Sequence, residues 1–327
     1  MNKKILIAIG VMTALSVVLF IALFIGKRET DTDVIRIGIL KHESSLPIYV
    51  ADELKIFEKY NVSVRLVELP PGDHMPALLS DRVDLISATS FPVLFGVLEN
   101  NPELLYAIMP GAEIVEGETV YGIITKADFK GDDIYSLKNK KILAINPYTK
   151  VSLLNILKNI NFSDSEIKDV NIANKDAALA AVLDNSADAC IMDQPPLAIA
   201  INSQKFKLLE PNPRAKYISN PYWSGSGAIK KETWDKNSQL YLNFLKAIDE
   251  AALYARNNSV EAHKILAKRL DIDENIALEM GGYYFPTIQE YVDKAELKNT
   301  ISALINAGLL KNDIDLLHIF PDNLYSK

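Results

Sequence analysis

The stretch Leu79-Ser80-Asp81-Arg82-Val83-Asp84-Leu85-Ile86 leads from the end of an amphipathic helix, through a polar turn, into an apolar strand. Later in the chain, Leu183-Asp184-Asn185-Ser186-Ala187-Asp188-Ala189-Cys190 repeats this order of features. In both stretches an aspartate begins the strand, and a loop that contains proline follows it. A helix that feeds directly into a strand is typical of mostly parallel sheets covered by helices. The echo therefore predicts two lobes of similar build.

The same alternation extends outward from these stretches over most of the chain. The predicted strands are residues 34–40, 62–68, 83–87, 104–109, 141–145, 188–193 and 206–209. The predicted helices between them are residues 47–60, 74–79, 91–99, 149–160, 174–183 and 196–202. From residue 238 onward the apolar spacing predicts only helices, at 240–256, 260–269, 274–280 and 288–307. The fold class is therefore α/β, with mostly parallel sheets flanked by helices and a helical C-terminal segment.

The order of these elements also predicts how the chain divides into domains. We expect a discontinuous first lobe of residues 34–112 and 226–327, and a second lobe of residues 113–225. The chain would return to the first lobe through residues 223–229. The glycines Gly225 and Gly227 suit a strand or hinge at which two backbones approach closely.

The N-terminal residues 1–33 are expected to be a transmembrane anchor and a linker. Residues 5–26 carry no charge, and a helix of that length reaches about 33 Å, enough to cross the apolar core of a bilayer. The run lacks a small-x-small cleavage site at its end, which favours an uncleaved single-pass anchor with the soluble part outside the cytoplasm. A cleaved signal peptide is the alternative, because Lys3 and Lys4 resemble its basic start.

Charge and composition exclude several classes of partner and chemistry. The net charge of −7 argues against nucleic acid or an anionic lipid surface as the partner. The single cysteine, Cys190, excludes an internal disulfide, and its apolar neighbours predict a buried, inert thiol. The four histidines form no known zinc motif, and no nucleophile or phosphate-binding motif is present. We therefore expect no metal, no cofactor and no catalytic residues.

Four predicted loops follow the carboxyl ends of strands, at residues 41–46, 87–91, 146–149 and 193–195. In open parallel sheets, ligands bind beyond these strand ends. Two of the loops come from each lobe, so a cleft between the lobes is the expected ligand site. The candidate ligand-binding residues are Ser44, Ser45, Thr89, Ser90, Tyr148, Thr149, Asp193 and Trp223.

Each candidate also has a purely structural interpretation. Thr89-Ser90 and Tyr148-Thr149 precede predicted helices, where they could cap the helix or bind an anion together with its free N–H groups. Asp193 could accept a hydrogen bond from a ligand amine or cap the next helix. Ser44 and Ser45 could simply be polar loop residues. Trp223, like its neighbour Tyr222, could stack on a planar ligand or pack between the lobes.

Several segments, in order, resemble the extracytoplasmic solute-binding proteins of ABC importers, in the group that includes nitrate, taurine, aliphatic-sulfonate and thiamine-precursor binders. The segments that carry the resemblance are Ile35-Arg36-Ile37-Gly38, Pro47–Ala51, Ile56–Lys59, Ala77–Asp84, Ser136–Ile142, Ala187-Asp188-Ala189, Asp193-Gln194-Pro195 and Phe244–Ala251. Asp81 and Asn139 stand where the group usually has glycine. Asp and Asn also tolerate positive φ, so these departures leave the expected fold intact.

The resemblance implies a two-lobed, type II periplasmic-binding-protein fold with two crossover strands and ligand closure between the lobes. It implies that the protein, expected as a monomer, captures a small-molecule ligand and delivers it to an ABC permease in the membrane. Two alternatives remain. One is an enzyme built on the same fold, which the missing catalytic motifs disfavour. The other is a receptor subunit that presents its ligand to a separate sensor.

Overall fold

The computed structural model describes residues 34–327 except 112, 116, 168, 224, 292–293, 307, 309, 312–317 and 325–327. The anchor predicted in residues 1–33 lies outside these residues. Within the described part of the chain, no helix is both long and apolar enough to cross a membrane.

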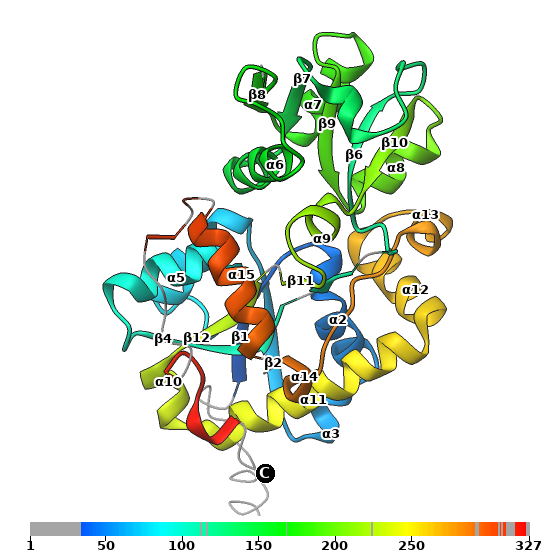
Figure 1. Cartoon of the computed structure of the whole chain (residues 1–327). Coiled ribbons are helices and arrows are strands. Elements are labelled where there is room, and N and C mark those ends of the chain that lie inside the picture. Colours follow the sequence, from blue (N-terminus) through cyan, green and yellow to red (C-terminus); the bar gives the residue numbers. More distant parts are fainter. Residues whose placement is uncertain are drawn as a thin grey trace, which may run out of the picture.

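Two five-stranded sheets form the centre of the fold (Figure 1). The first has the order β2 (Ser63–Glu68), β1 (Val34–Ile39), β3 (Leu85–Ser90), β12 (Gly225–Lys230) and β4 (Leu105–Pro110). The second has the order β8 (Asp169–Ile172), β7 (Lys141–Ala144), β9 (Ala189–Asp193), β6 (Tyr121–Lys126) and β10 (Phe206–Pro211). In each sheet the first three strands are parallel, and the fourth is antiparallel to both of its neighbours. The sheets therefore share one topology, and the two-sheet α/β architecture expected from the sequence is confirmed.

The antiparallel fourth strand is the one that connects the two halves of the molecule. β6 enters the second sheet directly after the first crossing, and β12 returns to the first sheet after the second. Between the sheets, β5 (Glu113–Ile114) pairs antiparallel with β11 (Tyr222–Trp223), so the two crossings are joined by a short ribbon. We call each sheet with its covering helices a lobe. The boundaries expected at 112/113 and 225/226 remain predictions.

Helices cover both sheets (Figure 1). Those of the first lobe are α2 (Leu46–Glu53), α3 (Ile56–Lys59), α4 (His74–Leu79), α5 (Phe91–Asn100), α10 (Lys231–Lys236), α11 (Ser238–Asn257), α12 (Ser259–Leu270), α13 (Glu274–Glu279), α14 (Ile288–Tyr291) and α15 (Lys294–Asn306). Those of the second lobe are α6 (Pro147–Asn159), α7 (Lys175–Leu183), α8 (Pro196–Asn202) and α9 (Pro213–Tyr217). Four short 3-10 turns, η2 (Glu43–Ser45), η3 (Pro71–Asp73), η4 (Ile134–Leu137) and η5 (Asp322–Leu324), complete the described elements.

Turn residues follow the expected backbone conformations. Asp81 and Asn139, which replace glycine of the related group, have φ values of 59° and 60°, in the left-handed region. Gly225 and Gly227 lie in β12 where backbones meet closely: a Cβ atom on Gly225 would lie 2.0 Å from the carbonyl oxygen of Thr89, and one on Gly227 would lie 2.7 Å from Cβ of Met109. The close approach expected for these glycines is confirmed.

One predicted helix was wrong, and two strands of the central sheets were missed. The single helix expected at 47–60 is two helices, α2 and α3, because Lys55 between them adopts a left-handed conformation with φ of 57°. The strand β6 was missed; it is buried at almost every position and so lacks an alternating pattern. The edge strand β8 was also missed, because its residues Asp169-Val170-Asn171-Ile172 include only one buried side chain.

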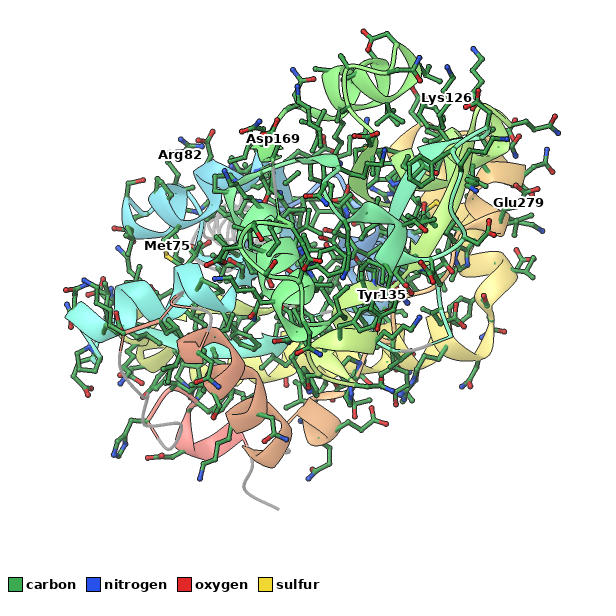
Figure 2. The ribbon with its side chains drawn as sticks, turned by 45° about the horizontal axis from the view of Figure 1, so that its top comes forward. Met75, Arg82, Lys126, Tyr135, Asp169 and Glu279 are labelled. Atoms are coloured by element: carbon green, nitrogen blue, oxygen red, sulfur yellow. The ribbon has the colours of Figure 1, made fainter. Side chains whose placement is uncertain are left out.

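Apolar side chains pack in the interior of the lobes, and charged side chains lie on the surface. In the first lobe α11 lies against α2 and α3, with Phe244 and Phe57 stacked at 5.7 Å between ring centroids. Cys190 is fully buried, as the sequence predicted, and burial raises the pKa of its thiol to about 12, which disfavours the reactive thiolate. Figure 2 shows charged side chains such as those of Arg82 and Glu279 on the outside of the molecule, where both are exposed.

Candidate ligand-binding cleft

A buried arginine occupies the centre of the candidate site. Arg214, in the short helix α9 after β10, is 7% exposed, and its Nε donates to Oγ of Ser152 on α6 at 2.9 Å. Three tyrosine rings surround the guanidinium. Its Cζ lies 4.0, 4.7 and 5.7 Å from the ring centroids of Tyr121, Tyr148 and Tyr222, respectively. We call these three residues the tyrosine cage; the hydroxyls of Tyr148 and Tyr222 are hydrogen-bonded to each other.

The positive charge of Arg214 lacks a counter-ion among the described residues, none of whose carboxylates forms an ion pair with it. Burial lowers the pKa of Arg214, but the surrounding tyrosines outweigh burial and raise it, so the side chain stays charged. Aromatic faces stabilise a cation without neutralising it, and a buried charge is costly unless it is paired. The arrangement is therefore suited to an anion that arrives from outside.

A second charged group, Asp193 at the end of β9, faces the first lobe. Its Oδ1 lies 3.0 Å from Nζ of Lys175, and its Oδ2 lies 3.8 Å from Nε2 of His42, which belongs to the loop after β1. Burial alone would raise the pKa of Asp193, but the contacts with His42 and Lys175 prevail and lower it to about 2. The contact between His42 and Asp193 joins one strand end from each lobe.

A buried acid lies beside this contact in the first lobe. Glu43 is 0% exposed; its Oε1 accepts from the backbone N–H of Tyr283 at 3.3 Å, and its Oε2 has no hydrogen-bond partner among the described residues. Burial raises the pKa of Glu43 well above its ordinary value, and the nearby charges of Asp193 and Glu118 raise it further. The side chain therefore favours the neutral form, which can donate as well as accept a hydrogen bond.

Two of the residues expected from the sequence lie directly in this arrangement, Tyr148 in the tyrosine cage and Asp193 opposite His42. Ser44 lies next to it, because its Oγ is 3.1 Å from Nδ1 of His42. Thr149 is buried in the first turn of α6, one turn before Ser152.

The remaining expected residues are placed for packing or at strand ends. Ser45 is 1% exposed and donates to the carbonyl of Leu40 at 2.8 Å. Thr89 and Ser90 are half-buried at the end of β3 and pair with β12. Trp223 is 3% exposed and packs within an apolar cluster of the first lobe, whereas the packing interpretation had placed it between the lobes.

The helix-capping alternatives were wrong at each of the three helices that they concerned, α5, α6 and α8. α6 is capped by Asn146, whose Oδ1 accepts from the N–H of Thr149 at 2.8 Å, so Tyr148 and Thr149 lie inside the helix. Ser90 stands at the N-cap of α5 without a side-chain capping bond. Asp193 does not cap α8, whose N-cap position is Pro195.

Sequence reasoning missed the residue with the largest electrostatic role, Arg214. It lies in no predicted element, between Pro213 and Ala215, and nothing in its neighbourhood marks it as buried. A weak signal was present in its neighbour Tyr222, which the sequence singled out as a residue able to stack. Lys175 and Glu43 were missed because their roles depend on contacts with Asp193 and Tyr283, which are distant in sequence.

Two sheets of shared topology, covered by helices and joined by two crossings, define a two-lobed α/β fold. The chain belongs to the NMT1/THI5-like family, whose model matches residues 42–262. No match was found among curated protein sequences.

Solved structures of binding proteins share this fold. The periplasmic aliphatic sulphonate binding protein SsuA from Escherichia coli has a TM-score of 0.70 at 16% identity, over 89% of this chain and 92% of that one. A ligand-binding component of an ABC-type import system from Staphylococcus aureus, with zinc bound, has a TM-score of 0.71 at 15% identity, over 90% and 98%. The nitrate-binding protein NrtA from Synechocystis has a TM-score of 0.69 at 15% identity, over 90% and 88%. At 15–16% identity, these likenesses show that the chain has the same fold as these binding proteins.

Proposed function

We propose that the protein captures a small anionic solute at Arg214, between its two lobes and outside the cytoplasm, and passes it to an ABC permease. The observation that carries the proposal is a buried guanidinium inside the tyrosine cage with no carboxylate partner among the described residues. A bound anion would supply the missing charge, and the guanidinium can form two parallel hydrogen bonds to a planar or tetrahedral oxyanion.

The opposite side of the site supports selectivity. The neutral form of Glu43 can donate a hydrogen bond to the solute, whereas an ionised carboxylate would repel an anion. Asp193 is held by Lys175 and His42, so its negative charge is already balanced. Two of the three structures named above are a sulphonate-binding and a nitrate-binding protein, and we extend an anionic ligand class to this chain. We propose a binding role without catalysis.

Calorimetric titration of the purified protein with nitrate, methanesulfonate, taurine and phosphate tests the proposal. At least one of these anions should bind, and Arg214→Ala should weaken its binding at least a hundredfold, about 2.7 kcal/mol. The matched control is Lys216→Ala, because Lys216 lies on the same helix but pairs with Glu210 at 2.8 Å. Equal affinity in wild type and Arg214→Ala would disprove an anion site at this position.

We also propose that residues 1–33 hold the protein on the outer face of the membrane as an uncleaved anchor. The support is the uncharged run of residues 5–26, without a cleavage site at its end. Membrane fractionation followed by N-terminal sequencing tests this. A soluble product that begins after Gly26 would show a cleaved signal peptide instead. Deletion of residues 1–33 should leave a soluble monomer.

A further inference from the structure

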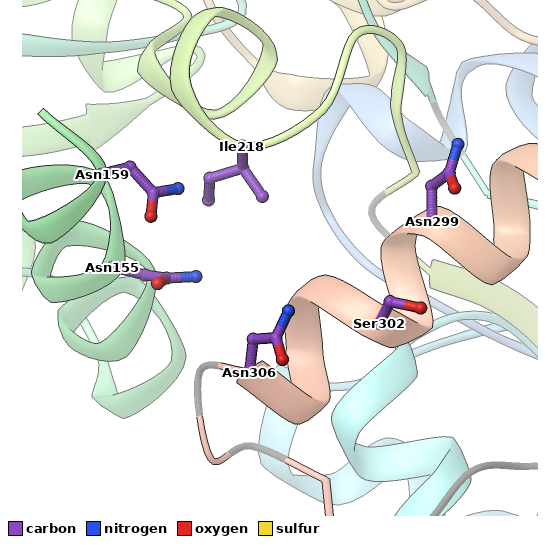
Figure 3. Close-up of a pocket in the computed structure, with 6 residues that line it drawn as sticks. All are labelled: Asn155, Asn159, Ile218, Asn299, Ser302 and Asn306. Atoms are coloured by element: carbon purple, nitrogen blue, oxygen red, sulfur yellow. The ribbon is translucent and has the colours of Figure 1, made fainter.

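A polar groove lies between α6 of the second lobe and α15 of the first (Figure 3). Asn155 and Asn159 come from α6, and Asn299, Ser302 and Asn306 come from α15, while Ile218 after α9 lines one end. The cavity has a volume of about 270 Å³. All of its polar lining groups are uncharged amides or a hydroxyl, which can both donate and accept hydrogen bonds.

The spacing of these residues places each set on one helix face. Asn155 and Asn159 are four residues apart, and Asn299, Ser302 and Asn306 are separated by three and four, so each set projects from a single side of its helix. Asn159 donates to the carbonyl of Tyr217 at 2.8 Å. Among the described residues, the amides of Asn155, Asn299 and Asn306 have no hydrogen-bond partner, so they are available to a bound molecule.

The groove and the arginine site share helix α6. Ser152, which accepts from Arg214, is one helical turn before Asn155 on the same face of α6, a rise of about 4.5 Å. On the other side, the N–H of Ile218 donates to the carbonyl of Arg214 at 2.9 Å. Ile218, which lines one end of the groove, is therefore one helical turn from the arginine along the chain. A ligand that contacts both Arg214 and the groove would therefore run along α6.

The volume also limits what the groove can hold. Pockets for complete small-molecule ligands usually measure about 300–1,000 Å³, and this groove is smaller. It suits one part of a ligand better than a whole one. Apolar contact with Ile218 beside four amides fits a group that carries several hydroxyls or amides on a short carbon skeleton.

We propose that the groove is a subsite for a neutral, hydrogen-bonding part of the solute, so that the ligand is an anion joined to a polyhydroxyl or amide group and not a bare anion. This inference rests on the proposed function, because it takes the anionic end of the ligand to be at Arg214.

The test compares probes that share an anionic group, with and without a polyhydroxyl chain. The pairs are inorganic phosphate with glucose 6-phosphate, methanesulfonate with 6-deoxy-6-sulfoglucose, and acetate with gluconate, titrated into the full-length protein. In at least one pair, the extended probe should bind at least tenfold more tightly than the bare anion. Asn155→Ala and Asn299→Ala should each reduce this ratio at least fivefold and leave the affinity for the bare anion unchanged. The matched control is Asn257→Ala, at the exposed end of α11.

The outcomes separate the two proposals. Arg214→Ala should abolish binding of both members of a pair; if the bare anion depends on Arg214 but the extended probes have no advantage, the subsite is disproved and the anion site stands. If binding is indifferent to Arg214, the proposed anion site fails. A ratio unchanged in both asparagine variants, or no binding by any extended probe, overturns the subsite. Small-angle scattering adds a further check on Asn155→Ala and Asn299→Ala. If these variants change the radius of gyration but not the binding ratio, the groove is a contact between the lobes and not a subsite.

Discussion

Asp84, just before β3 in the first sheet, and Asp188, just before β9 in the second, make the same contacts in two different lobes. The N–H of Asp84 donates to the carbonyl of Arg36 at 2.8 Å, and its carboxylate accepts from the N–H of Arg36 at 2.7 Å. The N–H of Asp188 donates to the carbonyl of Lys141, and its carboxylate accepts from the N–H of Lys141, both at 2.9 Å. Each aspartate thus fixes its strand to the start of the neighbouring parallel strand.

The turns before these aspartates match as well. Asp81 and Asn185, three residues ahead in each lobe, both have left-handed backbones, with φ of 59° and 64°. Asn61 and Asn161, each shortly after a helix, are also left-handed, with φ of 54° and 66°. The frame of the second lobe therefore repeats that of the first at the level of single residues.

The two lobes match at the starts of these strands but differ at the ends of the same strands. After β3 the first lobe has the neutral hydroxyls of Thr89 and Ser90, whereas β9 ends in Asp193, with its ion pair to Lys175. The first lobe contributes the buried acid Glu43, and the second contributes Arg214. The scaffold is thus repeated, whereas the residues at the strand ends and in the short helices near them differ between the lobes.

The largest expected effect concerns the shared frame. Asp84→Ala should lower the free energy of unfolding by about 2–3 kcal/mol, because it removes hydrogen bonds to the backbone and guanidinium of Arg36. Asp188→Ala should lower it by about 1–2 kcal/mol, because Asp188 is more exposed and its lysine partner, Lys140, lies at 3.3 Å. Urea unfolding measures both. Asp164→Ala, at an exposed ion pair, is the control and should change stability by less than about 0.5 kcal/mol. Equal stability of Asp84→Ala and the control would mean that the shared contacts do not hold the frame together.

The next prediction concerns the acid of the first lobe. The pKa of Glu43 is raised in the folded state, so the folded protein binds this proton more tightly than the unfolded chain does, and Glu43 reduces stability as pH rises above about 4.3. Glu43→Gln imitates the neutral form and should increase the free energy of unfolding at pH 7 by about 1–2 kcal/mol. The gain should disappear below about pH 4. A variant less stable than wild type at pH 7 would show that Glu43 is ionised and stabilising.

The acid of the second lobe should respond in the opposite direction. The pKa of Asp193 is lowered to about 2, so its contribution to stability is complete above the unfolded value of about 3.9 and is lost as pH falls toward 2. Asp193→Asn should lower the free energy of unfolding at pH 7 by about 1–2 kcal/mol, reduced from the full shift because Lys175 is partly exposed. Wild type and variant should converge near pH 2. Parallel pH profiles for Glu43→Gln and Asp193→Asn would remove the proposed difference between the lobes.

The two regions also differ in how far the sequence predicted them. The repeated helix, turn and strand of each lobe could be predicted from the sequence because they depend on local features. These features are apolar runs, a polar turn and an aspartate at the strand start, all within a few residues of one another. The candidate site could be predicted only in part. Strand-end positions such as Tyr148 and Asp193 follow from the topology of parallel sheets. The tyrosine cage comes from three separate elements, and Arg214 acquires its burial only when α9 packs beside α6.

The ribbon of β5 and β11 has a mechanical consequence. The two crossings pair with each other as β-strands, Tyr222 opposite Ile114 and Trp223 opposite Glu113. We therefore expect the two segments to bend together and not independently. Tyr222 belongs both to this ribbon and to the tyrosine cage, which forms the wall around Arg214. A rotation of one lobe against the other would therefore displace part of that wall, so the angle between the lobes and the shape of the proposed anion site would change together.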